Sequence, residues 1–266
     1  MSCDSCPAVM VCCLGESHAA LPNEQPAFLT IECERVKAGQ SANHARHEAG
    51  WPAAFEKAKS PDHYLALASM SGAPEVWYVI PTKSHADEAE SMKRMDKDPV
   101  LSAETSRLAE RDAQFIEGVT TIKAMARKDL SFGKFPDLAK TRFHEITTFT
   151  LKLGQDFKFV PLAKAYMAAH LRAAPNSSSR AYEVLAGLPQ HTYLMMSSVE
   201  KYEDFDQRVT DYKATFAGAT AEEMAELAKL GDVVERMVTN RYRVDPKQSY
   251  VPKETRESDP DFWSPK

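Results

Sequence analysis

The chain has 266 residues, of which 33 are basic and 38 acidic, giving a formal net charge of −5 at pH 7. The two signs are mixed along the chain, and no block of Lys and Arg with interleaved aromatic residues suggests a nucleic-acid partner. No apolar run approaches the length of about 18 residues that a membrane span needs. The composition therefore predicts a soluble globular protein without a membrane span.

Cysteines are concentrated at the beginning of the chain. Cys3, Cys6, Cys12 and Cys13 lie in the first thirteen residues, and only Cys33 lies in the body. This distribution excludes a disulfide framework across the fold. Cys3 and Cys6 form a C-x-x-C pair, but no strand precedes it as a thioredoxin-like redox site requires.

The same beginning has features of an export signal. The apolar stretch AVMVCCLG is followed by ESHAA, which places a small-residue cleavage site near Ala19 or Ala20. This pattern predicts a periplasmic or secreted protein. No Lys or Arg precedes the apolar stretch, so a cytoplasmic location stays open as the alternative.

Two segments 115 positions apart read alike. FLTIECERVKAGQ begins at Phe28 and FHEITTFTLKLGQ begins at Phe143. Without a gap, residues 28–58 and 143–173 share eight identities in 31 positions. HYLALASMSGAPEVWYVIP follows the first segment, and the similar AYEVLAGLPQHTYLMMS follows the second. The pattern indicates an internal repeat.

Each copy predicts the same series of elements. Alternating residues predict strands, apolar residues at helical spacing predict helices, and Asp98-Pro99 interrupts the long helical region. The first copy is expected to have strand, helix, two strands, helical region and strand at 28–36, 41–59, 64–69, 75–80, 85–118 and 119–127. The second is expected to have them at 143–152, 157–173, 181–186, 191–197, 200–230 and 233–244.

This order is β-α-β-β-α-β written twice, the ferredoxin-like motif. A four-stranded antiparallel sheet with helices on one face leaves its other apolar face uncovered, and two such sheets can cover each other. The predicted fold is α+β, with two tandem ferredoxin-like units forming an intrachain dimeric α+β barrel. The protein would then be a monomer with an internal pseudo-dimer, and further oligomerisation is left open.

The repeat also sets the expected domain limits. Residues 1–24 form a signal or a segment without regular structure that adds nothing to the core. The first unit covers 25–131, a linker 132–141 and the second unit 142–245. An irregular tail at 246–266 is anchored by Phe262 and Trp263.

Several stretches resemble a known family. RVKAGQ, HYLAL, QHTYL and the ending SYVPKETRESDPDFWSPK are similar to those of uncharacterised tandem-repeat proteins of bacteria, over about residues 26–266. With its element order, the chain resembles the dimeric α+β barrel superfamily, which includes antibiotic-biosynthesis and haem-degrading monooxygenases, EthD-like and NIPSNAP-type proteins. The resemblance concerns fold more than activity, because one fold carries many functions.

The resemblance implies a cleft between helices and sheet in which two kinds of function are expected. The first is binding of a small apolar molecule, and the alternative is a cofactor-independent or haem-associated monooxygenase-like enzyme. Haem-degrading relatives use an Asn on the first strand, a Trp on the third and a His near the second helix. Trp77 and His85 match the last two, but FLTIECERV has no Asn. Core packing and an exposed helix start are the plain alternatives for Trp77 and His85.

No nucleophile elbow, P-loop, dinucleotide fingerprint or H-E-x-x-H motif occurs. Enzymes of this superfamily can work without such motifs, so the sequence does not decide whether the protein is an enzyme. It assigns no cofactor either.

One helical stripe contains the remaining candidates. His44, His47, Trp51, Phe55 and Ala58 share a face of the helix at 41–59. The repeat maps this stripe onto Phe159, Leu162, Tyr166, His170 and Ala173. A stripe that is apolar in one copy is expected to face inward in both. The candidate ligand-binding residues are therefore His44, His47, Trp51, Trp77, His85, Tyr166 and His170.

Three interpretations of His44 and His47 stay open. They can lie at an exposed first turn, or line the first unit's cleft with Trp51 as acid–base groups or polar anchors. In the third, they bind a metal ion. Two histidines three residues apart lack a third ligand, although Glu48 is adjacent, and no metal site is assigned.

Overall fold

The computed structural model describes residues 21–264. Its antiparallel strands close into one barrel in the order β1–β3–β2–β8–β5–β7–β6–β4. The strands are β1 (Phe28–Val36), β2 (Leu65–Ser69), β3 (Glu75–Thr82), β4 (Ile116–Ala126), β5 (Phe143–Leu151), β6 (Arg180–Ala186), β7 (Thr192–Val199) and β8 (Val234–Val244). Every predicted strand is present to within three residues at each end.

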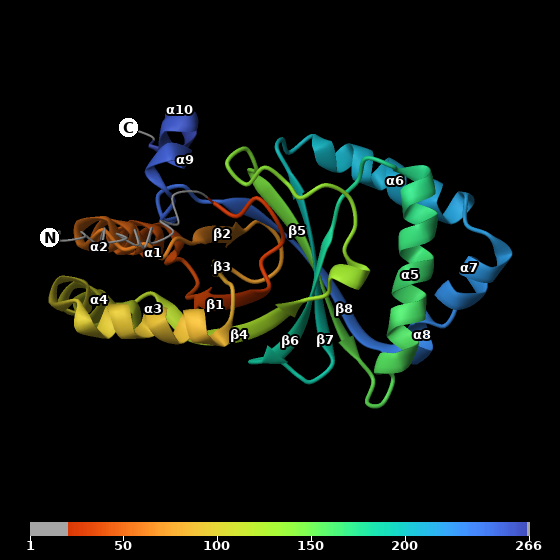
Figure 1. Ribbon diagram of the computed structural model, residues 1–266, viewed down its shortest axis with the longest axis horizontal. Coiled ribbons are helices and arrows are strands. Elements are labelled where there is room, and N and C mark those ends of the chain that lie inside the picture. The colour runs from red at the N-terminus through yellow and green to blue at the C-terminus, as the bar shows by residue number, and fades with distance from the viewer. Residues whose placement is uncertain (1–20, 265–266) are drawn as a thin grey trace, which may run out of the picture.

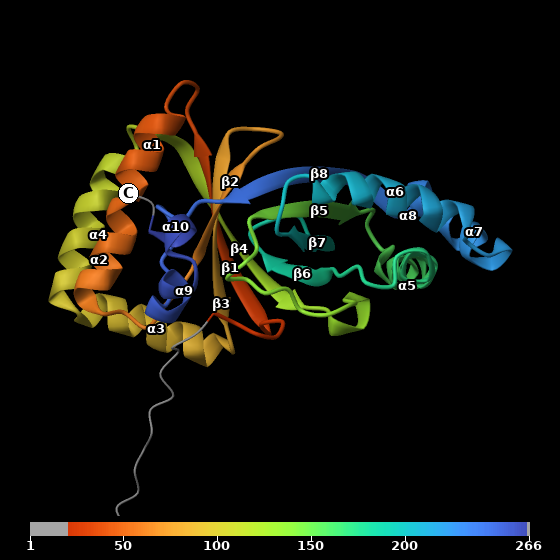
Figure 2. The same cartoon turned by 90° about the horizontal axis from the view of Figure 1, so that it is seen from above.

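Helices cover the barrel on two opposite sides (Figures 1 and 2). On the first side lie α1 (Ser41–Glu48), α2 (Gly50–Ala58), α3 (His85–Lys97) and α4 (Pro99–Asp112). On the other side lie α5 (Asp156–Ala173), α6 (Asp204–Ala217), α7 (Ala221–Leu227) and α8 (Leu230–Val233). Asp98 ends α3 and caps α4, since its carboxylate accepts from two backbone N–H groups of α4, and Pro99 occupies the first turn.

The two halves of the chain have the same strand order. It is β4–β1–β3–β2 in the first half and β8–β5–β7–β6 in the second. The halves join where β4 pairs with β6 and β2 pairs with β8. The result is a mixed α/β protein built on an eight-stranded antiparallel barrel, in which the two halves share one wall.

Alternation along the strands separates two kinds of core. Residues that point into the barrel form a central apolar cluster that includes Ile31, Trp77, Ile122, Ile146 and Leu194. The opposite faces of the strands contact the helices, and each half has its own apolar cluster there. Any cleft between helices and sheet therefore lies outside the barrel wall.

The helix expected at 41–59 is divided in two. α1 ends at Glu48 and α2 begins at Gly50, with Ala49 between them. A Cβ added to Gly50 would lie 2.8 Å from Leu108 Cδ2, so α4 crosses this junction at close range. Glycine permits the approach.

The C-terminal tail is more regular than expected. Residues Lys253–Ser258 form α9 and Pro260–Trp263 form α10, so the expectation of an irregular tail is wrong in part. Its anchoring is confirmed, because Trp263 is buried against the barrel cluster and its Nε1 donates to Ala139 O at 3.0 Å. Asp259 caps α10 and begins this short element.

The segment before β1 contributes to the core. Leu21 packs against the central cluster, and Gln25 donates to Ala181 O at 3.0 Å. The expectation that residues up to 24 add nothing to the core is therefore wrong for Leu21. The export signal and the four N-terminal cysteines lie outside the described residues. Among residues 21–264, no helix has the length and apolar character to cross a membrane.

Candidate functional site

A buried group of ionisable side chains lies between the helices and the sheet of the first half. His44 Nε2 is 2.8 Å from Glu34 Oε2, and His47 Nε2 is 2.6 Å from Asp112 Oδ1. Glu48 lies between these pairs, with its Oε1 4.0 Å from His47 Nε2. We call these five residues the first-half polar cluster. They come from β1, α1 and the end of α4.

Glu48 is only 2% exposed and is held from one side. The Tyr78 hydroxyl is 3.0 Å from Glu48 Oε2 and 3.0 Å from Gln248 Oε1, although it has a single proton to donate. Gln248 donates its amide to Asp245, so its oxygen faces Tyr78. Burial and the neighbouring carboxylates raise the pKa of Glu48 to about 9. A protonated Glu48 can donate to Tyr78 while Tyr78 donates to Gln248.

The exposed interpretation of the two histidines is wrong. His44 is 1% exposed, and the His47 side chain is 7% exposed. Neither lines the two larger cavities described below. Trp51 is half-buried against the apolar cluster of the first half, where Phe55, Tyr64 and neighbouring side chains fill the space beside the sheet.

Trp77 and His85 do not belong to the first-half polar cluster. Trp77, on β3, points into the barrel and pairs with Cys33 of β1. The centroid of its ring lies 5.2 Å from that of Tyr242. His85 begins α3 with a side chain that is 68% exposed and packs on Phe28. Both positions match the plain alternatives stated for them, core packing and an exposed helix start.

Tyr166 and His170 line a cavity of about 780 Å³ in the second half, which we call the second-half cleft. It lies between α5, α6 and the outer face of β5 and β7. Most of its wall is apolar, including Phe132, Phe149, Leu162, Met167, Met195 and Phe216. The rings of Tyr166 and His170 stack at 5.4 Å with 12° between their planes.

Hydrogen bonds define which nitrogen of His170 carries its proton. His170 Nδ1 is 2.8 Å from Thr215 Oγ1, and that hydroxyl donates to Asp211 O at 2.7 Å. Thr215 can therefore only accept from His170, so Nδ1 carries the proton and Nε2 has the lone pair in the neutral ring. Burial lowers the pKa of His170, which favours this neutral form.

Charged groups lie on one side of the second-half cleft. Arg208 donates from Nη2 to Ser198 O at 3.1 Å, and its Nε has no hydrogen-bond partner. Burial lowers the pKa of Arg208, while Glu145 and Asp211 oppose this effect. Glu145 also forms an ion pair with Arg241 at 3.0 Å. This side of the cleft can bind a polar or anionic group of an otherwise apolar molecule.

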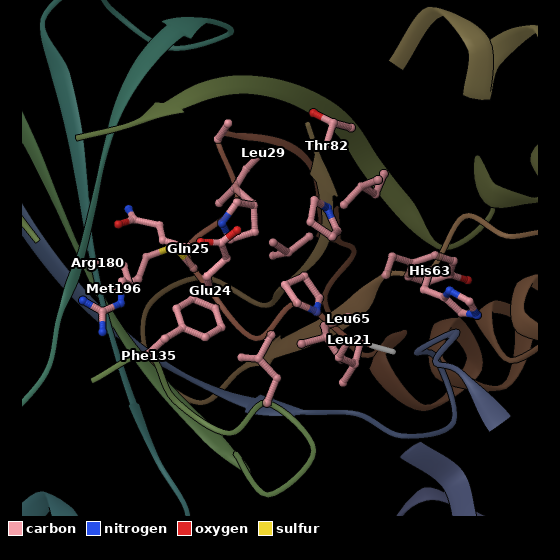
Figure 3. Close-up of a pocket in the computed structure, with 18 of the residues that line it drawn as sticks. Leu21, Glu24, Gln25, Leu29, His63, Leu65, Thr82, Phe135, Arg180 and Met196 are labelled. Atoms are coloured by element: carbon pink, nitrogen blue, oxygen red, sulfur yellow. The ribbon is translucent and has the colours of Figure 1, made fainter. Parts of the chain in front are cut away.

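A second cavity, of about 460 Å³, opens at one end of the barrel (Figure 3), and we call it the barrel-mouth cavity. Leu21, Leu29, Leu65 and Phe135 surround it, with Arg180 at one side. The Arg180 guanidinium donates to the carbonyls of residues 132, 133 and 179. These contacts fix the linker to β6.

No family model matches the sequence, and no curated protein matches it. Several solved structures have a similar fold. A proposed monooxygenase from Lactobacillus acidophilus NCFM has 8% identity and a TM-score of 0.52, with 86% of this chain and 97% of that chain covered. The likeness is one of fold.

Two further structures are similar in the same way. An anthrone oxidase-like protein has 11% identity and a TM-score of 0.53, with 84% of this chain and 93% of that chain covered. A proposed monooxygenase from Fusobacterium nucleatum has 10% identity and a TM-score of 0.51, over 82% and 91% of the two chains. These neighbours are of the dimeric α+β barrel type.

Sequence reasoning missed the partners that complete each group. Glu34 could have been noticed, because alternation along FLTIECERV places it opposite to Ile31 and Cys33, on the face toward the helices. Asp112 and Arg208 have no such signal. They meet His47 and the second-half cleft only through contacts between helices distant in the chain.

His144, on the wall of the barrel-mouth cavity, gives a pH prediction. It is 5% exposed and its Nε2 has no partner, and burial lowers its pKa from 6.5 to about 4. The unfolded chain therefore binds a proton at this site before the folded protein does. The contribution of neutral His144 to the free energy of unfolding is complete above pH 6.5. It is lost as the pH falls from 6.5 to about 4, by up to about 1.4 kcal/mol per pH unit.

We expect His144→Gln to flatten the fall of unfolding free energy between pH 6.5 and 4, measured by urea denaturation. His85→Gln, at an exposed site, is the matched control and should follow the wild type. An equally steep fall in His144→Gln would show that His144 is not the group responsible.

Proposed function

We propose that the protein binds a small, largely apolar molecule in the second-half cleft. The observation that carries this proposal is a cavity of about 780 Å³ with an apolar wall and a few polar groups on one side. Ligand sites of proteins are typically clefts of about 300 to 1,000 Å³ with this composition. Arg208 and Tyr166 would orient the polar group of the ligand.

We also infer that the two halves are copies of one ferredoxin-like unit. Phe28 pairs with Thr82 and Phe143 pairs with Val199, so β1 and β5, which are 115 residues apart, have equivalent partners in β3 and β7, which are 117 residues apart. At this offset, His170 takes the place of Phe55. Ser179 likewise takes the place of Tyr64, and each forms the equivalent isolated bridge.

These exchanges support an open cleft in the second half. Phe55 and Tyr64 contact each other at 5.6 Å in the first half and belong to its apolar cluster. Ser179 is smaller than Tyr64, and it lines the second-half cleft. The same frame thus has a filled space on one side and a cavity on the other.

Filling the cleft tests the proposal. Ala163 lines it from α5, whereas Ala168 on the same helix is exposed and outside it. We expect Ala163→Trp to weaken binding of anilinonaphthalene sulfonate, an aromatic dye with one anionic group, at least about tenfold, a loss of about 1.4 kcal/mol. Ala168→Trp is the control and should bind as the wild type does.

Fluorescence titration measures the affinity, and circular dichroism checks that both variants are folded. Equal affinity for the dye in the wild type and Ala163→Trp would place the dye elsewhere and contradict the proposal.

A second candidate function is cofactor-independent oxygenation in the same cleft. It is favoured by His170, whose Nε2 lone pair can accept a proton from an acidic C–H group of a bound substrate. The fold likeness to an anthrone oxidase-like protein suggests anthrone as the first substrate to test. Anthrone and O₂ would give anthraquinone and water, so no further reductant is needed.

We expect the wild type to consume O₂ with anthrone faster than buffer does, and His170→Gln to lower this rate by about 100-fold or more. An oxygen electrode measures both rates, and Ala168→Trp serves as the control. Haem added to the protein tests the haem-associated form, in which His170 Nε2 would hold the iron. If O₂ is not consumed and the Soret band of haem does not shift, both forms of oxygenation are contradicted and ligand binding is the remaining function.

A further inference from the structure

The first-half polar cluster has the donor atoms of a metal site. A nitrogen of His44 and one oxygen each of Glu34 and Glu48 lie within 4.8 Å of one another, and all three side chains are buried. We propose that these three residues bind one divalent transition-metal ion. An imidazole and two carboxylates form a donor set that suits ions such as Zn²⁺ or Mn²⁺.

The unpartnered oxygen of Glu48 is the independent observation behind this proposal. Tyr78 holds Glu48 Oε2 at 3.0 Å, while the buried Oε1 has no hydrogen-bond partner. A buried carboxylate oxygen without a partner is costly, and an ion would satisfy it. Tyr78 would then act as metal-site partners commonly do, by fixing the orientation of a ligand.

Ligand spacing is close to what an ion requires. Bonds of about 2.0 to 2.2 Å to nitrogen and oxygen in tetrahedral geometry place neighbouring donors roughly 3.3 Å apart. His44 Nε2 and Glu34 Oε2 are 2.8 Å apart, so a shift of a few tenths of an ångström separates them enough. The ion would take the place of the proton that these groups otherwise share.

The charge of the carboxyl groups in the first-half polar cluster also favours a bound cation. The hydrogen-bond and ion-pair partners of Glu34, Glu48 and Asp112 among the described residues are histidines and Tyr78, with no Lys or Arg among them. Three buried carboxyl groups without a permanent cation destabilise a folded protein unless they are protonated or bind a cation.

The second half shows that the frame does not need this cluster. At the offset of 115 residues, Glu34, His44 and Glu48 correspond to Phe149, Phe159 and Ala163, and strand pairing aligns Tyr78 with Met195. All four counterparts are apolar. Apolar side chains therefore suffice for packing at these positions, and the polar set in the first half calls for a separate purpose.

Zinc retention tests the assignment on the full chain. Protein stripped with EDTA, incubated with ZnCl₂ and desalted is expected to retain about one Zn²⁺ per chain by mass spectrometry, with a raised melting temperature. Glu48→Gln and His44→Gln should lose both effects. His85→Gln removes an exposed histidine beside Glu88 and should retain zinc as the wild type does.

Two further variants locate the ion. Asp112→Asn should keep the zinc, because Asp112 belongs to the neighbouring trio with His47 and Glu48. Tyr78→Phe should weaken zinc binding by about 10- to 100-fold without abolishing it. A wild type that retains no zinc overturns the proposal, as does a Glu48→Gln variant that retains as much as the wild type. Loss in Asp112→Asn with retention in His44→Gln overturns the choice of ligands.

Should the ligand variants fail to fold, the wild type alone decides. CoCl₂ added to the stripped protein is expected to give a visible absorption band of bound Co²⁺ that excess ZnCl₂ removes. No band would overturn the proposal.

Discussion

Two pairings between distant strands, β4 with β6 and β2 with β8, set the frame on which everything else in the molecule depends. A four-stranded sheet that packs helices on one face has a second apolar face that water must not reach. Closing two such sheets into one barrel buries both inner faces and removes the open edges. The helices are then confined to the outside, and so is any cleft between helix and sheet.

The space between helices and sheet is filled differently on the two sides of the barrel. In the first half, Phe55 and Tyr64 fill the space beside the sheet, and the segment after β8 adds Tyr250 to them. In the second half, His170 and Ser179 line a cavity beside the sheet. The space between helices and sheet is therefore filled on one side of the barrel and open on the other.

The polar groups follow the same division. The first half has buried carboxyl groups and histidines beside its sheet, whereas Phe149 and Phe159 pack in the apolar cluster of the second half. In the second half, ionisable groups such as Glu145 and Arg208 instead lie around the cleft. Buried charge with no opening fits an ion, whereas charge at the edge of an apolar cavity fits a larger molecule.

Much of the architecture can be predicted from the sequence, because alternation and helical spacing are local properties. FLTIECERV reads as a strand on its own, and Asp98-Pro99 marks a helix boundary on its own. The location of the cleft cannot be predicted in this way. It depends on the sizes of the side chains that meet between helix and sheet, as Phe55 and Tyr64 do in the first half.

Long-range contacts limited the site prediction for the same reason. The stripe that contains His44 and His170 was expected to face inward, and both residues do lie against the sheet or a cavity. Their partners Glu34, Asp112 and Thr215 come from other elements. Short helices such as α10 were missed because four residues give too little periodicity to recognise.

We infer that one side of this barrel is open to a ligand and the other is filled. Crystals soaked with bromoanthracene test it directly, because bromine has an anomalous signal that locates the ring. We expect a bromine peak in the second-half cleft, between α5 and the outer face of β5 and β7. A peak between α1, α4 and β1 of the first half, with none in the second-half cleft, would contradict it.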